Sequence, residues 1–269
     1  MEISVILDLM FNMKSQIKII ESGRDIGIMS AAPEFFKKGT PLKERKEAVH
    51  QNRLKLGQKY NFDGNHIFRI LQKSPWRKLR YKDGKYVVIE DKHLTKKDYW
   101  FEEIKGDILI TSNKYKNIVL GDTSADCPIL ICEDRKKGYT AISHCGATYV
   151  DRKLPCDIIK ALKEVCDSKE EDIYVYIGTA ITKEYYIYDR YPKWAKHKRV
   201  WKNHIIKEKD GYHIDVIGAI YEQLNKIGIN NIETSKTNTY SDDNFYSHVA
   251  AYQGKKEKKG QNFIGFYYE

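Results

Sequence analysis

Runs and alternations of apolar residues divide this chain into short strands with a few helices between them. Strand-length apolar segments are predicted at 17–20, 67–71, 86–89, 107–111, 118–120, 173–177, 185–190, 232–235 and 263–267. Apolar residues recur at helical spacing over 41–57, 155–166 and 214–227. Neighbouring strands precede a helix and more strands follow it, so the order predicts an α+β fold with a mixed sheet rather than a doubly wound fold.

The first predicted helix carries signals at both ends. Thr40 is a suitable N-cap, Pro41 fits the first helical position, and Gly57 is expected to end the helix. The residues expected to face the core recur at intervals of seven: Leu42, Val49 and Leu56.

A short hairpin over 124–144 holds the most suggestive pair of side chains. We take its turn as Asp134 to Lys137, which places Glu133 opposite Gly138 and Cys127 opposite His144. Directly opposed side chains on one face have Cβ atoms roughly 4.5–5.5 Å apart. A thiol beside an imidazole suits either a thiolate–imidazolium nucleophile pair or two ligands of one zinc ion. A slip of one residue would place the two side chains on opposite faces.

Composition and charge favour an ordinary globular protein. The chain has 269 residues, of which 41% are hydrophobic and 31% charged, with 47 Lys and Arg against 37 Asp and Glu and a net charge of +10. A nucleic-acid partner is not expected, because the basic residues are spread along the chain and no nucleic-acid-binding motif accompanies them. A small phosphorylated molecule remains a possible partner for this charge.

Targeting signals and cysteine usage indicate a cytoplasmic protein. No stretch of 18 apolar residues is present and the N-terminus lacks the features of a signal peptide, so no membrane association is expected. The five cysteines are odd in number and form no CxxC motif, which favours a reducing compartment. The sequence does not indicate an oligomeric state.

Several motifs resemble the laccase-domain (multicopper polyphenol oxidase) family. The core pattern of that family, roughly Thr-Ala-Asp-Cys-x-Pro followed by His-Ala-Gly-Trp-Arg-Gly, stands here as Ser-Ala-Asp-Cys-Pro at 124–128 and His-Cys-Gly-Ala-Thr-Tyr at 144–149. Three further stretches follow the family's order: 106–111, 177–181 and 238–266. The resemblance implies a single domain over 1–269 with layered α/β/β/α architecture and mixed sheets, like the catalytic domain of cytotoxic necrotizing factor.

The resemblance also implies a function. Family members are described as zinc-dependent purine nucleoside phosphorylases, with adenosine deaminase activity also reported. The implied metal ligands here are Cys127 and His144, with zinc expected rather than copper, and the implied substrate is a nucleoside or nucleotide-linked molecule. Arg24 and Arg53 fall where the family carries arginines near its site, so they are candidates for substrate binding.

The departures from the family pattern leave three readings open. The family's third metal ligand comes from a Gln-Val-His-Gly stretch, whereas 72–75 here is Gln-Lys-Ser-Pro. A third ligand would have to come from elsewhere, for example His66, His93 or His248. The protein is therefore a phosphorylase-like enzyme with a rebuilt zinc site, a metal-free cysteine–histidine hydrolase or deamidase, or a non-catalytic protein that binds a nucleoside or a protein partner.

Overall fold

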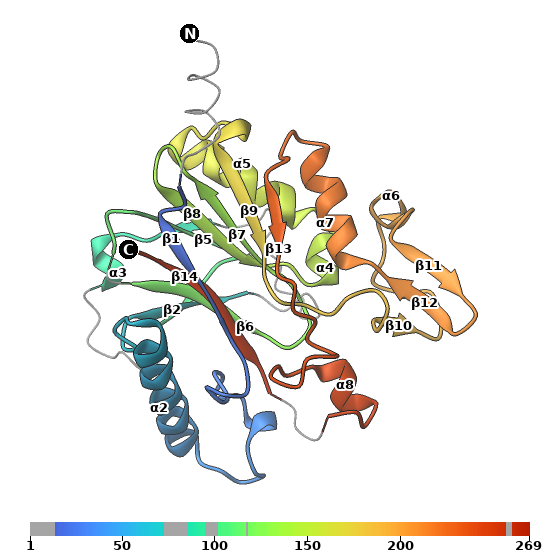
Figure 1. Ribbon diagram of the computed structural model, residues 1–269, viewed down its shortest axis with the longest axis horizontal. Helices are drawn as coiled ribbons and strands as arrows, with labels where there is room; N and C mark the ends of the chain where they lie inside the picture. The colour runs from blue at the N-terminus through green and yellow to red at the C-terminus, as the bar shows by residue number, and fades with distance from the viewer. Residues whose placement is uncertain (1–13, 73–85, 95–101, 117, 257–259) are drawn as a thin grey trace.

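Two mixed β-sheets, with helices on their outer faces, form the body of the protein (Figure 1). The computed structural model describes residues 14–72, 86–94, 102–116, 118–256 and 260–269. In these residues, no helix is both long enough and apolar enough to cross a bilayer.

The first sheet has five strands. Its order is β1 (Ile17–Ser22), β14 (Asn262–Tyr268), β6 (Val119–Ser124), β2 (Ile67–Leu71) and β4 (Glu102–Lys105). The β1–β14 and β14–β6 pairs are antiparallel, whereas β6–β2 and β2–β4 are parallel. The long helix α2 (Leu42–Tyr60) lies on its outer face, where Val49 and Leu56 are fully buried.

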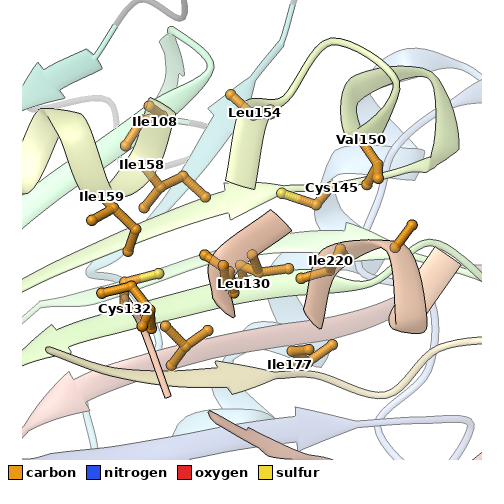
Figure 2. Packing of buried hydrophobic residues seen from close by; sticks show 14 of the residues in the cluster. Ile108, Leu130, Cys132, Cys145, Val150, Leu154, Ile158, Ile159, Ile177 and Ile220 are labelled. Atoms are coloured by element: carbon orange, nitrogen blue, oxygen red, sulfur yellow. The ribbon is translucent and has the colours of Figure 1, made fainter. Parts of the chain in front are cut away.

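The second sheet has six strands. Its order is β13 (Ile232–Thr234), β9 (Ile173–Ile177), β7 (Ile129–Asp134), β8 (Tyr139–His144), β5 (Ile108–Ser112) and β3 (Tyr86–Val88). The helices α4 (Ala147–Val150), α5 (Leu154–Cys166) and α7 (Val216–Asn225) cover its outer face. Figure 2 shows how Ile158 and Ile159 of α5 and Ile220 of α7 pack toward Leu130 and Cys132 of β7.

Three apolar clusters correspond to the three contacts between layers. One lies under α2 and includes Leu56 and Phe263, and the largest lies under α5 and α7. The third is between the sheets, where Leu120 of β6 and Ile142 of β8 are both fully buried. The α/β/β/α layering and the mixed sheets predicted from the sequence are therefore confirmed. The likeness to the cytotoxic necrotizing factor domain stays a prediction.

A small third sheet stands at one side of the body (Figure 1). In sheet order its strands are β10 (Ile187–Tyr188), β12 (Gly211–Ile214) and β11 (Ile205–Glu208). The single-turn helix α6 (Lys198–Trp201) lies between β10 and β11 in the sequence. The remaining short elements are η1 (Pro33–Phe35), α3 (Asp91–Leu94), η2 (Glu170–Asp172) and α8 (His248–Tyr252). The sequence predicted one strand over 185–190, of which only Ile187 and Tyr188 pair.

The expected boundaries of α2 are wrong at both ends. Thr40 directs its hydroxyl back to the carbonyl of Lys37 instead of capping the helix. The helix continues through Gly57 and ends at Asn61, which adopts the left-handed conformation (φ 59°). Leu42 is 53% exposed, so it does not belong to the buried stripe.

The predicted register of the β7–β8 hairpin is also wrong, by two residues. His144 lies opposite Ile129, and Asp134 lies opposite Tyr139. Gly138 belongs to the loop and not to the strand, because it adopts a positive φ of 69° that closes the turn. Asp134 stabilises the loop by accepting hydrogen bonds from the backbone N–H groups of Lys136 and Lys137.

Candidate functional site

Cys127 and His144 lie side by side although they are not a cross-strand pair. His144 is the last residue of β8, whereas Cys127 lies in the bend between β6 and β7, two residues before β7 begins. A shift of two residues preserves the face on which a side chain lies, so the thiol still turns toward the imidazole. Both side chains border the space at Gly146, and the interaction with Cys127 contributes to the raised pKa of His144.

Gly146 provides the space in which the Cys127 sulfur lies. A Cβ atom at position 146 would be 2.8 Å from Cys127 Sγ and 3.8 Å from Cδ2 of His144. The glycine has an ordinary φ of −60°, so it is needed here for its lack of a side chain and not for its backbone freedom. The sulfur and the imidazole therefore meet above the entry to α4.

A buried carboxylate holds the other side of the imidazole. Asp122 of β6 places Oδ2 3.0 Å from Nδ1 of His144, and its own Oδ1 is 3.3 Å from Nη2 of Arg69 on β2. Nη2 of Arg69 also donates to the Thr123 hydroxyl at 2.8 Å. Because Asp122 occupies Nδ1, the imidazole has Nε2 available for Cys127. The order thiol, imidazole, carboxylate matches the geometry of a nucleophile, a base and the group that orients the base.

These contacts set the protonation of His144. Burial alone would lower its pKa, but the hydrogen bonds with Asp122 and Cys127 outweigh burial and raise the pKa to about 10. The imidazole is therefore positively charged near neutral pH.

Two tyrosines lie close to the pair. Burial raises the pKa values of Tyr149 in α4 and Tyr186 before β10, and a negative charge on Cys127 raises both further. The hydroxyl oxygens of Tyr186 and Tyr188 are 3.3 Å apart, and this hydrogen bond connects the site to the third sheet. Aromatic rings beside a reacting centre provide apolar faces on which a flat heterocycle can stack.

Asp126 supports the loop instead of the chemistry. Its carboxylate accepts hydrogen bonds from the Thr239 hydroxyl and from the backbone N–H of Val249, both at 2.9 Å. Burial raises its pKa in spite of these bonds. The carboxylate therefore ties the Cys127 bend to the start of α8.

The other cysteines lie away from the site. Cys145 follows His144 but points into the core under α4 (Figure 2), and Cys132 is equally buried. Burial raises the pKa values of both thiols. Cys156 and Cys166 are half-buried on α5. Cys127 is the cysteine in contact with the imidazole.

The two arginines expected to bind substrate make structural contacts. The guanidinium of Arg24 lies 4.9 Å from the centre of the Tyr246 ring, and its Nε donates to the carbonyl of Phe245. Arg53 is 1% exposed and donates to the Ile67 carbonyl, which fixes α2 to β2. A role of either arginine in substrate binding stays a prediction.

The described residues supply two zinc ligands at the pair and not three. A catalytic zinc ion normally has three protein ligands and one open position. In the described parts of the chain, one group of three ligand-type side chains has its ligand atoms within 4.8 Å of one another: Glu208, Asp210 and His213. The expected third ligands, His66, His93 and His248, are thus not grouped with Cys127 and His144. Ser74, at the position of the family's third ligand, lies outside the described residues.

The group on the third sheet is explained by an ordinary ion pair. Nε2 of His213 is 2.8 Å from Oδ1 of Asp210, and this hydrogen bond raises the pKa of His213. Nδ1 of His213 is held by the carbonyl of Lys183 at 3.0 Å. A doubly protonated imidazole satisfies both contacts without a metal.

A cavity elsewhere in the molecule is separate from the pair. It has a volume of about 590 Å³ and lies between β1 and β13, at the open edges of the two large sheets. Its walls include Ile17, Glu133 and Tyr174 but neither Cys127 nor His144. The size of this cavity therefore says nothing about the substrate of the pair.

Three residues of the site were missed in the sequence. Asp122 and Arg69 are single charged residues within apolar strands, and because β2 and β6 are neighbours the two charges meet. Charges in buried strands are rare unless paired, so this pattern was the available signal. Gln72 follows β2 and donates from Nε2 to the His144 carbonyl at 3.0 Å. No sequence pattern indicates that contact.

Known proteins share this fold at low sequence identity. YlmD from Geobacillus stearothermophilus superposes with a TM-score of 0.71 at 17% identity, covering 95% of this chain and 93% of that chain. The hypothetical protein YfiH of Bacillus licheniformis gives a TM-score of 0.65 at 19% identity, covering 83% and 82%. The Neisseria meningitidis protein NMB0706 gives 0.66 at 14% identity, covering 95% and 96%.

Sequence comparison places the chain in a family without matching it to a curated protein. No curated protein matches the sequence. Residues 18–264 match the family described as Multi-copper polyphenol oxidoreductase laccase, and this range includes the bend with Cys127, the end of β8 and both buried charges. The chain therefore belongs to the multi-copper polyphenol oxidoreductase laccase family.

Proposed function

We propose that this protein is an enzyme acting on a purine nucleoside or a nucleotide-linked molecule, with Cys127 and His144 as its reacting residues. The observation that carries the proposal is the contact series from Cys127 through His144 to Asp122. Family membership supports the substrate class, and the neighbouring rings of Tyr149 and Tyr186 suit a flat base. The free cysteines support a cytoplasmic location.

The proton-transfer chemistry of the site is centred on the imidazole of His144. Near neutral pH the imidazole of His144 already carries its second proton, so an imidazolium faces the Cys127 sulfur and Asp122 stabilises that charge through Nδ1. The imidazolium can then protonate a leaving group such as a purine nitrogen or ammonia. Arg69 holds Asp122 in place through the contact of its Nη2 with Oδ1.

A zinc ion bound by Cys127 and His144 is an alternative form of the proposed site. Cys127 and His144 are suitable donors, and a carboxylate on the second nitrogen of a ligating histidine is common in zinc sites. Bound zinc would activate a water or a phosphate oxygen. The described residues do not complete the ligand set, so we derive no step through zinc.

The proposal is tested by assaying the protein, purified without a chelating tag, against adenosine and inosine with and without phosphate, while its zinc content is measured. Release of free base or ammonia that is lost in Cys127→Ala and His144→Ala, but retained in Cys156→Ala, supports it. Stoichiometric zinc with phosphate-dependent base release would identify the phosphorylase. Substoichiometric metal together with no base release contradicts the phosphorylase.

A metal-free cysteine hydrolase or deamidase is the second candidate, and the Asp122–His144 contact favours it. In such an enzyme the Cys127 thiolate attacks the substrate carbon and His144 returns the proton to the leaving amine. An activated thiol reacts quickly with iodoacetamide at neutral pH. Labelling of Cys127 that is no faster than labelling of Cys132 or of half-buried Cys156 argues against this candidate.

A non-catalytic binding protein is the remaining alternative, because the family's third ligand and its Trp-Arg-Gly are replaced here. Thermal shifts against a nucleotide panel, with the ligand recovered intact and no turnover in the assays above, would favour this alternative.

A further inference from the structure

The side of the molecule formed by α6 and β11 carries most of the net charge. Residues 190–209, here called the basic lobe, contain eight Lys and Arg against one acidic residue, Glu208, so they contribute +7 of the chain's net charge of +10. All eight basic residues are exposed: Arg190, Lys193, Lys196, Lys198, Arg199, Lys202, Lys207 and Lys209. A count over the whole sequence concealed this clustering.

Exposed carboxylates flank the basic lobe at Asp189 and Asp210, and Asp210 is paired with His213. Elsewhere exposed lysines form ion pairs, such as Lys59 with Asp25 and Lys163 with Glu170. Among the described residues, none of the eight basic side chains of the lobe forms an ion pair, and Glu208 is directed toward His213 at 3.9 Å. Like charges held together without counter-charges repel one another, and a polyanion relieves that repulsion.

The basic lobe is held in a fixed shape. The buried carboxylate of Asp151 accepts hydrogen bonds from the backbone N–H and Nδ1 of His197 and from Nε1 of Trp201, each at 2.9 Å. Trp194 packs edge-to-face on Trp201 with ring centres 5.1 Å apart. The charges are therefore displayed on a folded surface and not on a tail.

Aromatic rings lie among these charges. Tyr191 is 41% exposed and meets Tyr212 edge-to-face at 5.8 Å, and the Lys207 ammonium lies 5.7 Å from the Tyr212 ring centre. Basic residues interleaved with accessible rings are the arrangement by which proteins bind unpaired nucleotides: cations contact the phosphates and the rings stack on bases.

We propose that the basic lobe binds a single-stranded polynucleotide, with its lysines and arginines on the phosphates and Tyr191 against a base. A duplex fits less well, because α6 spans only Lys198–Trp201, one turn, and is too short to follow a major groove. A bilayer also fits less well, because the exposed large apolar residues of the lobe are limited to Tyr191 and Ile206. This inference goes beyond the chemistry at Cys127 and does not depend on it.

The test measures the binding of the intact protein to a fluorescent polyuridine of about 20 nucleotides at about 150 mM salt. A variant with Lys193→Glu, Lys196→Glu, Lys198→Glu and Arg199→Glu is compared with a control that carries Lys37→Glu, Lys38→Glu, Lys43→Glu and Lys55→Glu. Both variants change the net charge equally, and all eight positions are exposed. We expect the lobe variant to bind at least about tenfold more weakly, with a shallower salt dependence, and the control to bind within about threefold of the wild type.

Equal weakening in both variants, or no binding by the wild type, would overturn the proposal. Further arms use polythymidine, a duplex of equal length, and vesicles containing phosphatidylserine. Polyuridine and polythymidine distinguish RNA from DNA as the source of the strand. Tighter binding to the duplex or to the vesicles than to either single strand would also overturn the proposal.

A tyrosine variant tests the stacking contact. Tyr191→Ala is expected to weaken binding of the single strand by about fivefold or more while leaving duplex binding unchanged. Tyr252→Ala is the matched control, since Tyr252 is 77% exposed and lies on α8, outside the lobe. An unchanged affinity in Tyr191→Ala would contradict the assigned base contact.

Discussion

At the scale of single residues, the imidazole of His144 depends on Asp122 from β6 and on Cys127 from a bend, and Arg69 of β2 holds Asp122 in turn. The sequence indicated that Cys127 and His144 come together, because a shift of two residues leaves a side chain on its face. It did not indicate Asp122, Arg69 or Gln72, since contacts between strands distant in sequence follow from sheet order and not from local pattern. The roles proposed for Cys127 and His144 stay predictions until activity is measured.

Gly146→Ala is expected to disturb the Cys127 sulfur with little effect on the fold. The new methyl group would lie 2.8 Å from Sγ, so the thiol must move away from the imidazole, and alkylation of Cys127 should slow by about 10- to 100-fold. Mass spectrometry of iodoacetamide-treated protein measures the rate. The double variant Cys127→Ala/Gly146→Ala should recover the stability that Gly146→Ala loses. A loss of stability that is as large in the double variant as in Gly146→Ala would contradict this explanation.

The charge on His144 predicts how stability depends on pH. The folded pKa of about 10 exceeds the ordinary value of 6.5, so protonation favours the folded state. The contribution is fully present below pH 6.5 and is lost as the pH rises through 10. Urea unfolding of metal-free protein should therefore show the stability advantage of wild type over His144→Asn shrinking across that window. An advantage that grows with pH would contradict the prediction.

At the scale of elements, the sequence predicted most strands and the helices α5 and α7, because their apolar patterns are regular. The errors fell at element ends. The first helix was expected to stop at Gly57, but the helix tolerates this glycine, and the left-handed Asn61 ends it. The β7–β8 register was missed because Gly138 belongs to the loop, which a hydrophobic pattern does not reveal.

Asp134→Ala is expected to loosen that hairpin. Asp134 is fully buried, and its carboxylate serves two loop N–H groups and the hydroxyl of Ser168. Loss of these acceptors should cost about 2–3 kcal/mol of unfolding free energy. Asp134→Asn, which keeps one acceptor oxygen, should cost less. Equal costs in urea denaturation would show that the loop bonds are not the source of stability.

At the scale of the whole molecule, the two large sheets share one apolar layer, and each has its own helical cover. The layering was predictable from the family resemblance, whereas the third sheet was not, since its strands have only two to four residues. The single domain over 1–269 stays a prediction. Because the two sheets share an apolar core, we expect all layers to unfold together in one transition.

That prediction is tested by comparing two probes of unfolding. In a variant with Trp76→Phe and Trp100→Phe, the remaining tryptophans, Trp194 and Trp201, report on the side that carries the basic lobe. Far-UV circular dichroism reports on the sheets and helices. One domain predicts coincident urea transitions by both probes, whereas separate midpoints would indicate two independently folding units.

The position of β14 has a consequence for how the protein is made. β14 is the final strand in sequence order, yet it lies inside the five-stranded sheet, hydrogen-bonded to β1 on one side and β6 on the other. While the ribosome is still translating the residues before β14, β1 and β6 have already been synthesised, but the strand that pairs with both of them is missing. The strands β6, β2 and β4 can pair earlier, but β1 joins the first sheet only after β14 leaves the exit tunnel. Until then the nascent chain exposes apolar residues that a chaperone would bind.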